Sequence, residues 1–154
     1  MTHVLLIKTP GAWANGDPET VDFHSKIKLG ESIHADFKRM RNAAFHRKLF
    51  SLLTIGFEYW EPPDLTTKWG KPEKNFKRFR KDVTILAGYY HNVFRLDGTF
   101  RIEADSISFG NMEQCVFDKL YQDVLTVLLK KIPMMSKIGA DEIDKLTDKF
   151  LEFA

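Results

Sequence analysis

The sequence lacks the residues on which several common classes of protein depend. Cys115 is the only cysteine among 154 residues, which excludes an internal disulfide framework and disfavours a cysteine-based zinc site. The five histidines show no H-x-x-x-H or similar ligand spacing. We therefore predict neither a metal ion nor another cofactor, and a reducing compartment suits the chain best.

Motifs for nucleotide binding and nucleophilic catalysis are also missing. The chain contains no P-loop, no G-x-G-x-x-G and no G-x-S-x-G. Cys115 lies in the first turns of an expected amphipathic helix, where a small, half-buried side chain is a commoner role than a nucleophile. The sequence leaves an enzyme open but favours a protein without catalytic activity.

Long apolar runs are missing too. No window approaches the roughly 20 residues of a transmembrane helix, and the apolar run at residues 4–7 is too short for a signal peptide. Hydrophobic residues make up 44% of the chain and charged residues 29%, as in ordinary globular proteins. We expect a soluble cytoplasmic protein that does not bind membranes.

Acidic residues are scarce where basic residues are dense. Residues 38–81 hold twelve lysines and arginines against four acidic residues, a local charge of +8. The rest of the chain holds eleven basic and seventeen acidic residues, a charge of −6, so the net charge of +2 hides a strongly polarised molecule. Such polarity concerns partners rather than fold.

Hydrophobic periodicity predicts the elements of the chain. Residues 3–8 and the alternating residues 32–38 are predicted as strands, with one helical turn after Asp17-Pro18. Asp97-Gly98, the preferred type I′ turn, predicts a hairpin between Tyr89 and Asp105. Helical periods occur in a basic helical region and in two C-terminal helices, namely residues 38–87, 112–132 and 141–153. We predict a single α+β domain over residues 1–154, in which a small antiparallel sheet with a central hairpin packs against three to four amphipathic helices.

The second helix of the basic region carries a single-sign stripe. Lys74, Lys77, Arg78 and Lys81 recur at i, i+3, i+4 and i+7, with no acidic residue between Lys74 and Lys81. A solvated helix face is the plain interpretation, but phosphate backbones would neutralise such a stripe, and nearby aromatic rings suit the stacking of unpaired bases. The predicted nucleic-acid-binding residues are Arg41, Arg47, Lys48, Lys68, Trp69, Lys71, Lys74, Lys77, Arg78, Lys81, Tyr89 and Tyr90.

Several segments are similar to known phage sequences. His46–Phe50, Phe57–Pro62, the long block Asn75–Tyr90 and Ser106–Phe109 resemble an uncharacterised phage and prophage family, domain of unknown function 1367. The likeness covers nearly the whole chain and implies a phage or prophage origin, without an activity. Arg41–Phe50 is also similar to the helix opening of the NinB/Orf recombination mediators of lambdoid phages, although Phe45-His46 replaces their Gln-Asn pair and Phe50 their Trp.

These features lead to one hypothesis and two alternatives. The first is a non-enzymatic phage accessory protein in the host cytoplasm that binds single-stranded or junction DNA in replication or recombination. The second is a small phage inhibitor of a host protein, which would use the acidic face of the C-terminal helix. The third is a metal-dependent nuclease with Asp82, Glu103 and Asp105 as ligands. The sequence leaves the oligomeric state open, a dimer included.

Overall fold

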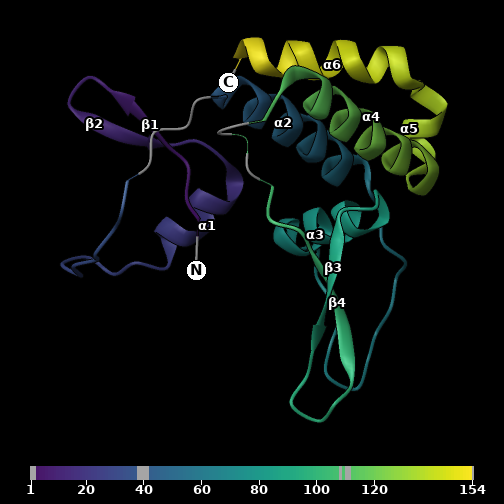
Figure 1. Cartoon of the computed structure of the whole chain (residues 1–154), viewed down its shortest axis with the longest axis horizontal. Coiled ribbons are helices and arrows are strands. Elements are labelled where there is room, and N and C mark those ends of the chain that lie inside the picture. The colour runs from purple at the N-terminus through teal and green to yellow at the C-terminus, as the bar shows by residue number, and fades with distance from the viewer. Residues whose placement is uncertain (1–2, 38–41, 108, 110–111, 154) are drawn as a thin grey trace. The chain divides into compact units, whose positions relative to one another are not determined.

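The computed structural model describes residues 3–37, 42–107, 109 and 112–153. Within these residues the chain forms six helices and two separate antiparallel sheets of two strands each (Figure 1). It divides into two compact units, Met1–Met40 and Arg41–Ala154. The predicted α+β class is confirmed. None of the helices in the described ranges has the length and apolar character needed to span a membrane.

The Met1–Met40 unit consists of a short hairpin and one helix. β1 (Leu6–Thr9) pairs with β2 (Ala12–Asn15), and α1 (Pro18–Ser25) follows Asp17, whose carboxylate accepts a hydrogen bond from the Thr20 amide at 2.7 Å. The expected turn of helix after Asp17-Pro18 is therefore confirmed and extends over two turns. The hairpin was not predicted beyond its first strand.

The strand predicted at residues 32–38 is wrong. Residues 31–37 form no regular secondary structure, and Lys38 lies outside the described residues. The sequence does alternate at Ile33, Ala35 and Phe37, but no strand pairs with this segment in the described structure. Without a neighbouring strand, its backbone groups have no ladder of hydrogen bonds to join. The Phe37 ring stacks on Trp13 instead, with 6.0 Å between the centroids.

The Arg41–Ala154 unit contains five helices. They are α2 (Ala43–Tyr59), α3 (Phe76–Leu86), α4 (Gln114–Lys131), α5 (Pro133–Ile138) and α6 (Ala140–Phe153). Four of them match the predicted helical segments within a few residues. The short α5 was not predicted, because Pro133 indicates the end of α4, whereas proline is also favoured in the first turn of a helix.

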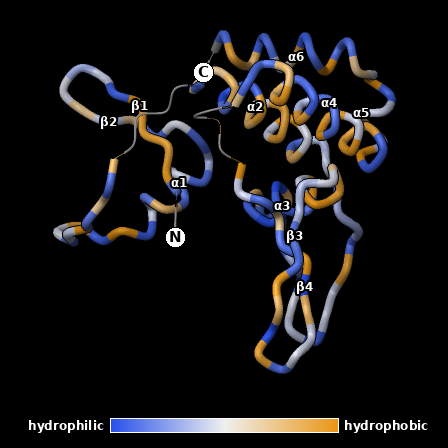
Figure 2. The backbone as a smooth tube through the Cα atoms, in the orientation of Figure 1, coloured by the Kyte–Doolittle hydropathy of each residue, from blue (hydrophilic) through white to orange (hydrophobic). Residues whose placement is uncertain are grey.

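The hydrophobic core of this unit lies among α2, α4, α5 and α6. Leu52, Leu128, Met135 and Ile143 are fully buried there. Apolar and polar segments alternate along these helices in Figure 2, which is the pattern of amphipathic helices packed around a core. The apolar residues that recur at helical spacing along α4 are all buried: Phe117, Leu120, Tyr121, Val124, Val127 and Leu128.

Aromatic rings fill much of the space between α2 and its neighbours. Phe45 of α2 stacks on Phe117 of α4 with the centroids 4.2 Å apart. On its other side, Phe57 makes an edge contact with Phe79 of α3 at 5.5 Å. The first contact holds α4 to α2 and the second holds α3 to α2, while Leu86 at the end of α3 is exposed.

The second sheet is the predicted hairpin, with a different turn. β3 (Tyr90–Phe94) pairs with β4 (Phe100–Ala104), and the pairing continues to Arg95, whose amide donates to the Thr99 carbonyl at 2.6 Å. The loop therefore has three residues, and only its glycine, Gly98, has a positive φ (85°). A type I′ turn needs positive φ at both central residues, so that prediction is wrong.

The side chain of Asp97 shapes this three-residue loop. Its Oδ1 accepts hydrogen bonds from the Thr99 amide at 2.9 Å and from the Thr99 hydroxyl at 2.6 Å. Both bonds hold the pKa of the Asp97 carboxyl below its ordinary value. The aspartate thus caps the turn locally, and Gly98 provides the left-handed residue that a three-residue hairpin loop requires.

Candidate nucleic-acid interface

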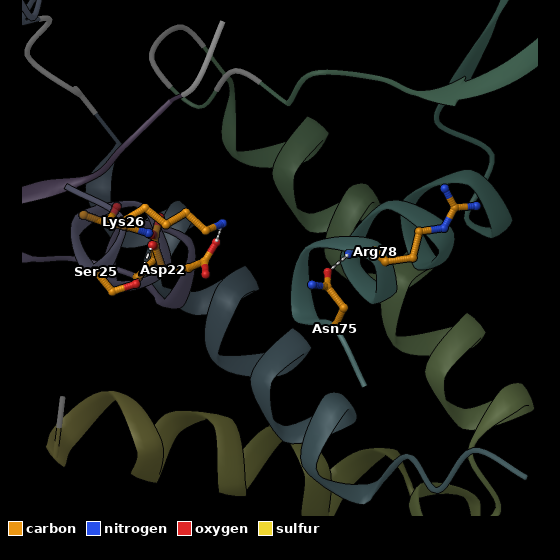
Figure 3. Close-up of polar contacts among 7 residues, drawn as sticks. Asp22, Ser25, Lys26, Asn75 and Arg78 are labelled. Atoms are coloured by element: carbon orange, nitrogen blue, oxygen red, sulfur yellow. Dashed lines mark hydrogen bonds and ion pairs between the residues drawn. The ribbon is translucent and has the colours of Figure 1, made fainter. Parts of the chain in front are cut away.

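Helix α3 presents the basic stripe because its opposite face is buried. Asn75 caps the helix, with Oδ1 accepting a hydrogen bond from the Arg78 amide at 2.9 Å, and the Arg78 side chain extends away from this cap (Figure 3). Phe79 and Val83 are buried. Helical spacing then places Lys77, Arg78 and Lys81 on the outer face, where all three are exposed.

The charges of this outer face are only partly balanced. Arg78 forms an ion pair with Asp82 one turn later, at 3.1 Å. Lys77 and Lys81 make no ion pair within the described part of the chain. Since they are themselves one turn apart, they repel each other, at a cost of roughly 0.2–0.5 kcal/mol for such a pair. We call Lys77, Arg78 and Lys81 the α3 cations.

Lys74, the expected first member of the stripe, lies outside the helix. α3 begins at Phe76, so Lys74 precedes the capping residue. Its Nζ donates to the Phe57 carbonyl of α2 at 2.6 Å and lies 4.6 Å from the Phe57 ring centroid. The lysine therefore ties the incoming loop to α2, and the four-residue stripe is reduced to the three α3 cations.

The loop before α3 carries three of the predicted residues. Thr67 and Gly70 exchange two backbone hydrogen bonds of 3.0 Å, which form a tight turn around Lys68 and Trp69. Trp69 is 85% exposed, and the Lys68 ammonium lies 4.6 Å from its ring centroid. Lys71 forms an ion pair with Asp64 at 2.8 Å. Of these three, Trp69 offers the most accessible contact surface.

Of the predicted cations at α2, Lys48 is turned toward α4 and not toward the α3 cations. The Lys48 ammonium lies 4.8 Å from the centroid of Tyr121, so this side chain is half-buried against α4. Arg47 is exposed on α2. Arg41 lies outside the described residues.

Tyr89 and Tyr90 have different roles, as the alternation of an extended chain requires. The Tyr89 hydroxyl donates to Oδ2 of Asp123 on α4 at 2.8 Å. Burial, and then this hydrogen bond, raise the pKa of Tyr89. Tyr90 points the other way and is 47% exposed, so of the two only Tyr90 is placed to stack on a base.

The carboxylates considered as metal ligands each contact a basic residue. Asp82 pairs with Arg78, Glu103 with Arg101, and Asp105 with Nδ1 of His91 at 2.8 Å. Among the described residues, no group of three or more histidine, cysteine, aspartate or glutamate side chains is arranged to hold a metal ion. The geometry therefore gives no support to a nuclease centre at these positions.

The acidic helix α6 uses part of its charge within its own unit. Asp144 accepts a hydrogen bond from the buried Tyr121 hydroxyl at 2.7 Å. Glu142 pairs with Lys145 at 2.7 Å, and this ion pair lowers the pKa of the Glu142 carboxyl. Over the ranges that the structure describes, α6 provides no such partner to Lys77 or Lys81.

Sequence reasoning missed two exposed aromatic residues, Phe94 and Phe100, on the hairpin. They face each other across the strands. The signal was available in the alternation of Tyr90, Asn92 and Phe94 along one strand, which places both rings of that strand on one face. Thirteen phenylalanines in a short chain predicted an aromatic core, and this prediction left rings on the surface unconsidered.

Comparison with known proteins identifies the family. The family model described as a protein of unknown function (DUF1367) matches residues 1–68 and 65–153, so the chain belongs to this family. No match was found among curated proteins or among solved structures. The family description names no activity, and the function therefore has to be argued from the residues themselves.

Proposed function

We propose that this protein is a non-enzymatic phage or prophage accessory protein that binds single-stranded or junction DNA in replication or recombination. The observation that carries the proposal is the outer face of α3, where Lys77 and Lys81 stand one turn apart without an ion-pair partner in the described structure and Arg78 stands beside them. What distinguishes these two from other exposed lysines is their place one turn apart on a helix face, beside Arg78 and with no acidic residue between them.

A polyanion is the partner that this arrangement favours. A phosphate backbone relieves the repulsion between Lys77 and Lys81, and each phosphate contact releases a condensed counterion, which adds to the affinity. The shape of the cation set also matters. α3 offers three positive charges along about one turn, which suits successive phosphates better than one carboxylate.

Unpaired bases are favoured over a continuous duplex by the exposed rings near these cations in the sequence. Trp69 is held outward by its tight turn, and Tyr90 follows α3 by four residues. Bases in a duplex are stacked on one another and offer no face to such rings, whereas single strands and junctions do. The phage setting is supported by the resemblance of the chain to phage and prophage sequences.

A salt-titrated binding series tests the proposal. The affinity for a labelled 30-nucleotide single strand is measured by fluorescence anisotropy from low to moderate salt, for the wild type and for Lys77→Ala/Lys81→Ala. The plot of log affinity against log salt should become shallower by about 0.7 for each phosphate that the variant no longer neutralises. A matched control is Lys145→Ala/Lys149→Ala, which removes the same charge from α6 and should leave the slope unchanged.

Two results would overturn this proposal. One is the absence of binding by the wild type at low salt. The other is an equal reduction of the slope in the α3 and α6 variants, which would show that net charge rather than the α3 cations governs binding. Gel analysis of the same complexes with added Mg²⁺ or Mn²⁺ checks that the strand remains uncut, as expected for a protein without catalytic activity.

A further inference from the structure

The hairpin of β3 and β4 separates its side chains into two different faces. In the observed register Tyr90 pairs with Ala104, Asn92 with Ile102, and Phe94 with Phe100. Paired residues share a face, and residues two apart in a strand share it as well. One face therefore carries Tyr90, Asn92, Phe94, Phe100 and Ile102, and we call it the aromatic face.

The opposite face of the hairpin carries charge. His91 contacts Asp105, and Arg101 forms an ion pair with Glu103. This is also the side on which Tyr89, just before β3, reaches Asp123 of α4. The pairing extends to Tyr89, whose carbonyl accepts from the Asp105 amide at 3.0 Å, so the alternation holds there and Tyr90 points away from that contact with α4.

The aromatic face is open to solvent. Phe94 is 82% exposed and Phe100 61%. Figure 1 shows the hairpin projecting from the helices of its own unit, and Figure 2 shows apolar segments continuing along it toward the turn. Asn92, Phe94 and Phe100 line a shallow hollow of about 200 Å³. Removing these rings from water would lower the free energy relative to leaving them exposed. We therefore expect a partner to cover this face.

We infer that the aromatic face stacks unpaired bases of a single-stranded nucleic acid, with Phe94, Phe100 and Tyr90 as the stacking rings. The inference rests on the proposed function, which gives the phosphate contacts to the exposed cations of α3. α3 packs directly against β4. One packed pair of elements thus offers rings for bases and positive charge for phosphates. A purely apolar partner would match the rings but would leave the charges of Lys77 and Lys81 unbalanced.

The spacing of the side chains suits this ligand. Residues two apart in a strand are separated by about 6.8 Å, so Tyr90 and Phe94 lie roughly 13–14 Å apart along β3, with Asn92 between them. Rings at such intervals accept splayed bases, and sheets that display aromatic residues to single strands are a recurring solution. The Asn92 amide adds a donor and an acceptor for a base edge.

The test replaces the rings while the phosphate contacts stay in place. Phe94→Leu/Phe100→Leu keeps the residues apolar but removes the ring faces, and Phe94→Tyr/Phe100→Tyr keeps them. Binding to labelled oligothymidylate is compared with binding to an abasic strand of equal length. The leucine variant should bind oligothymidylate about 5- to 100-fold more weakly for each base that no longer stacks on a ring, with an unchanged salt slope.

Three comparisons make the outcome decisive. The tyrosine variant should bind like the wild type, and so should Leu96→Ala, which alters an exposed apolar residue at the turn without touching a ring. The wild type should prefer oligothymidylate to the abasic strand, and the leucine variant should lose that preference. If the wild type binds with a steep salt slope but the leucine variant keeps full affinity and preference, the stacking face is wrong while the proposed function stands. If the wild type binds neither strand, the proposed function itself has failed.

Discussion

Two regions of the Arg41–Ala154 unit differ in how they place aromatic side chains. Among α2, α4, α5 and α6, most aromatic rings pack against one another, as in the stack of Phe45 on Phe117, and only Tyr59 and Phe150 of the described rings are exposed. In the region formed by α3 and the β3–β4 hairpin, Phe94 and Phe100 are exposed. Both regions contain phenylalanine, so residue type does not explain the difference. What differs is whether a second element covers the ring.

Charged groups divide less clearly, because both regions hold paired and unpaired cations: in the described structure Lys130 and Lys131 of α4 make no ion pair, whereas Arg78 of α3 makes one. On the helical side, Asp144 accepts a hydrogen bond from the Tyr121 hydroxyl. Burial is the main cause that raises the pKa of Tyr121, and this hydrogen bond is the second. On the other side Lys77 and Lys81 have no ion pair within the described residues. α3 joins the two regions, since it buries Phe79 and Val83 toward the core and exposes its cations. The helical region holds the buried core, and we propose that the α3–hairpin region serves recognition.

The largest effect on this contrast is expected from Leu128→Ala. Leu128 is fully buried between α2 and α4, and its removal leaves a cavity that the packed helices cannot close. The free energy of unfolding should fall by about 2–5 kcal/mol. Urea unfolding followed by circular dichroism measures it. A reduction of less than about 1 kcal/mol would mean that this part of the core is loosely packed. The helical region would then differ less from the α3–hairpin region than we describe.

A smaller reduction is expected from Gly56→Ala. A Cβ at Gly56 would lie 2.9 Å from Cδ2 of Leu128 and 3.4 Å from the Phe79 ring, so the fully buried Leu128 side chain would have to shift within the packed core. The strain of about 1–3 kcal/mol outweighs the gain of nearly 1 kcal/mol in helix propensity, and a net destabilisation of about 1 kcal/mol follows. Unfolding of the single variant and of Gly56→Ala/Leu128→Val should show that the smaller residue 128 relieves part of the strain.

We expect the contact between the two regions to weaken in acid. Hydrogen bonds from Lys119 and Tyr89 lower the pKa of the Asp123 carboxyl, which holds the start of the hairpin to α4. Because the folded-state pKa is the lower one, this stabilisation is present above the unfolded-state pKa and is lost as the pH falls through the folded-state value. Asp123→Asn should therefore lower the free energy of unfolding by about 1 kcal/mol at pH 7.

That difference should narrow as the pH falls below about 4, the ordinary range of an aspartate. Chemical unfolding of the wild type and of Asp123→Asn at a series of pH values gives the measurement. Asp118→Asn is a suitable control, because Asp118 is exposed on the same helix and accepts a hydrogen bond only from the neutral Gln114 side chain in the described structure. A constant gap between wild type and Asp123→Asn down to about pH 3 would contradict the prediction.

The smallest effect on stability is expected where we propose binding. Phe94→Leu/Phe100→Leu replaces rings that cover no other element, so the free energy of unfolding should change by no more than about 0.5 kcal/mol. Thermal unfolding of this variant beside Leu128→Ala checks the contrast directly. A decrease of about 2 kcal/mol or more would show that the aromatic face is part of the folded core, and the division between a stabilising and a recognising region would then be wrong.

Local patterns in the sequence determined much of this protein. Helical periods within residues 38–87 and 112–132 predicted α2, α3 and α4, and the runs around Asp97-Gly98 predicted the hairpin. These features depend on residues a few positions apart, and such spacing is visible in a single sequence. The family, too, was identified from the sequence.

Tertiary structure alone decided which of the candidate residues remain available. Lys74 is held by Phe57, Lys48 by Tyr121 and Tyr89 by Asp123, each a partner far away in the sequence that no local period indicates. The segment before residue 38 shows the reverse case, because its alternation had no strand to pair with in the described structure. The reason is physical: a period shows which face of an element is apolar, whereas exposure depends on whether another element comes to cover that face.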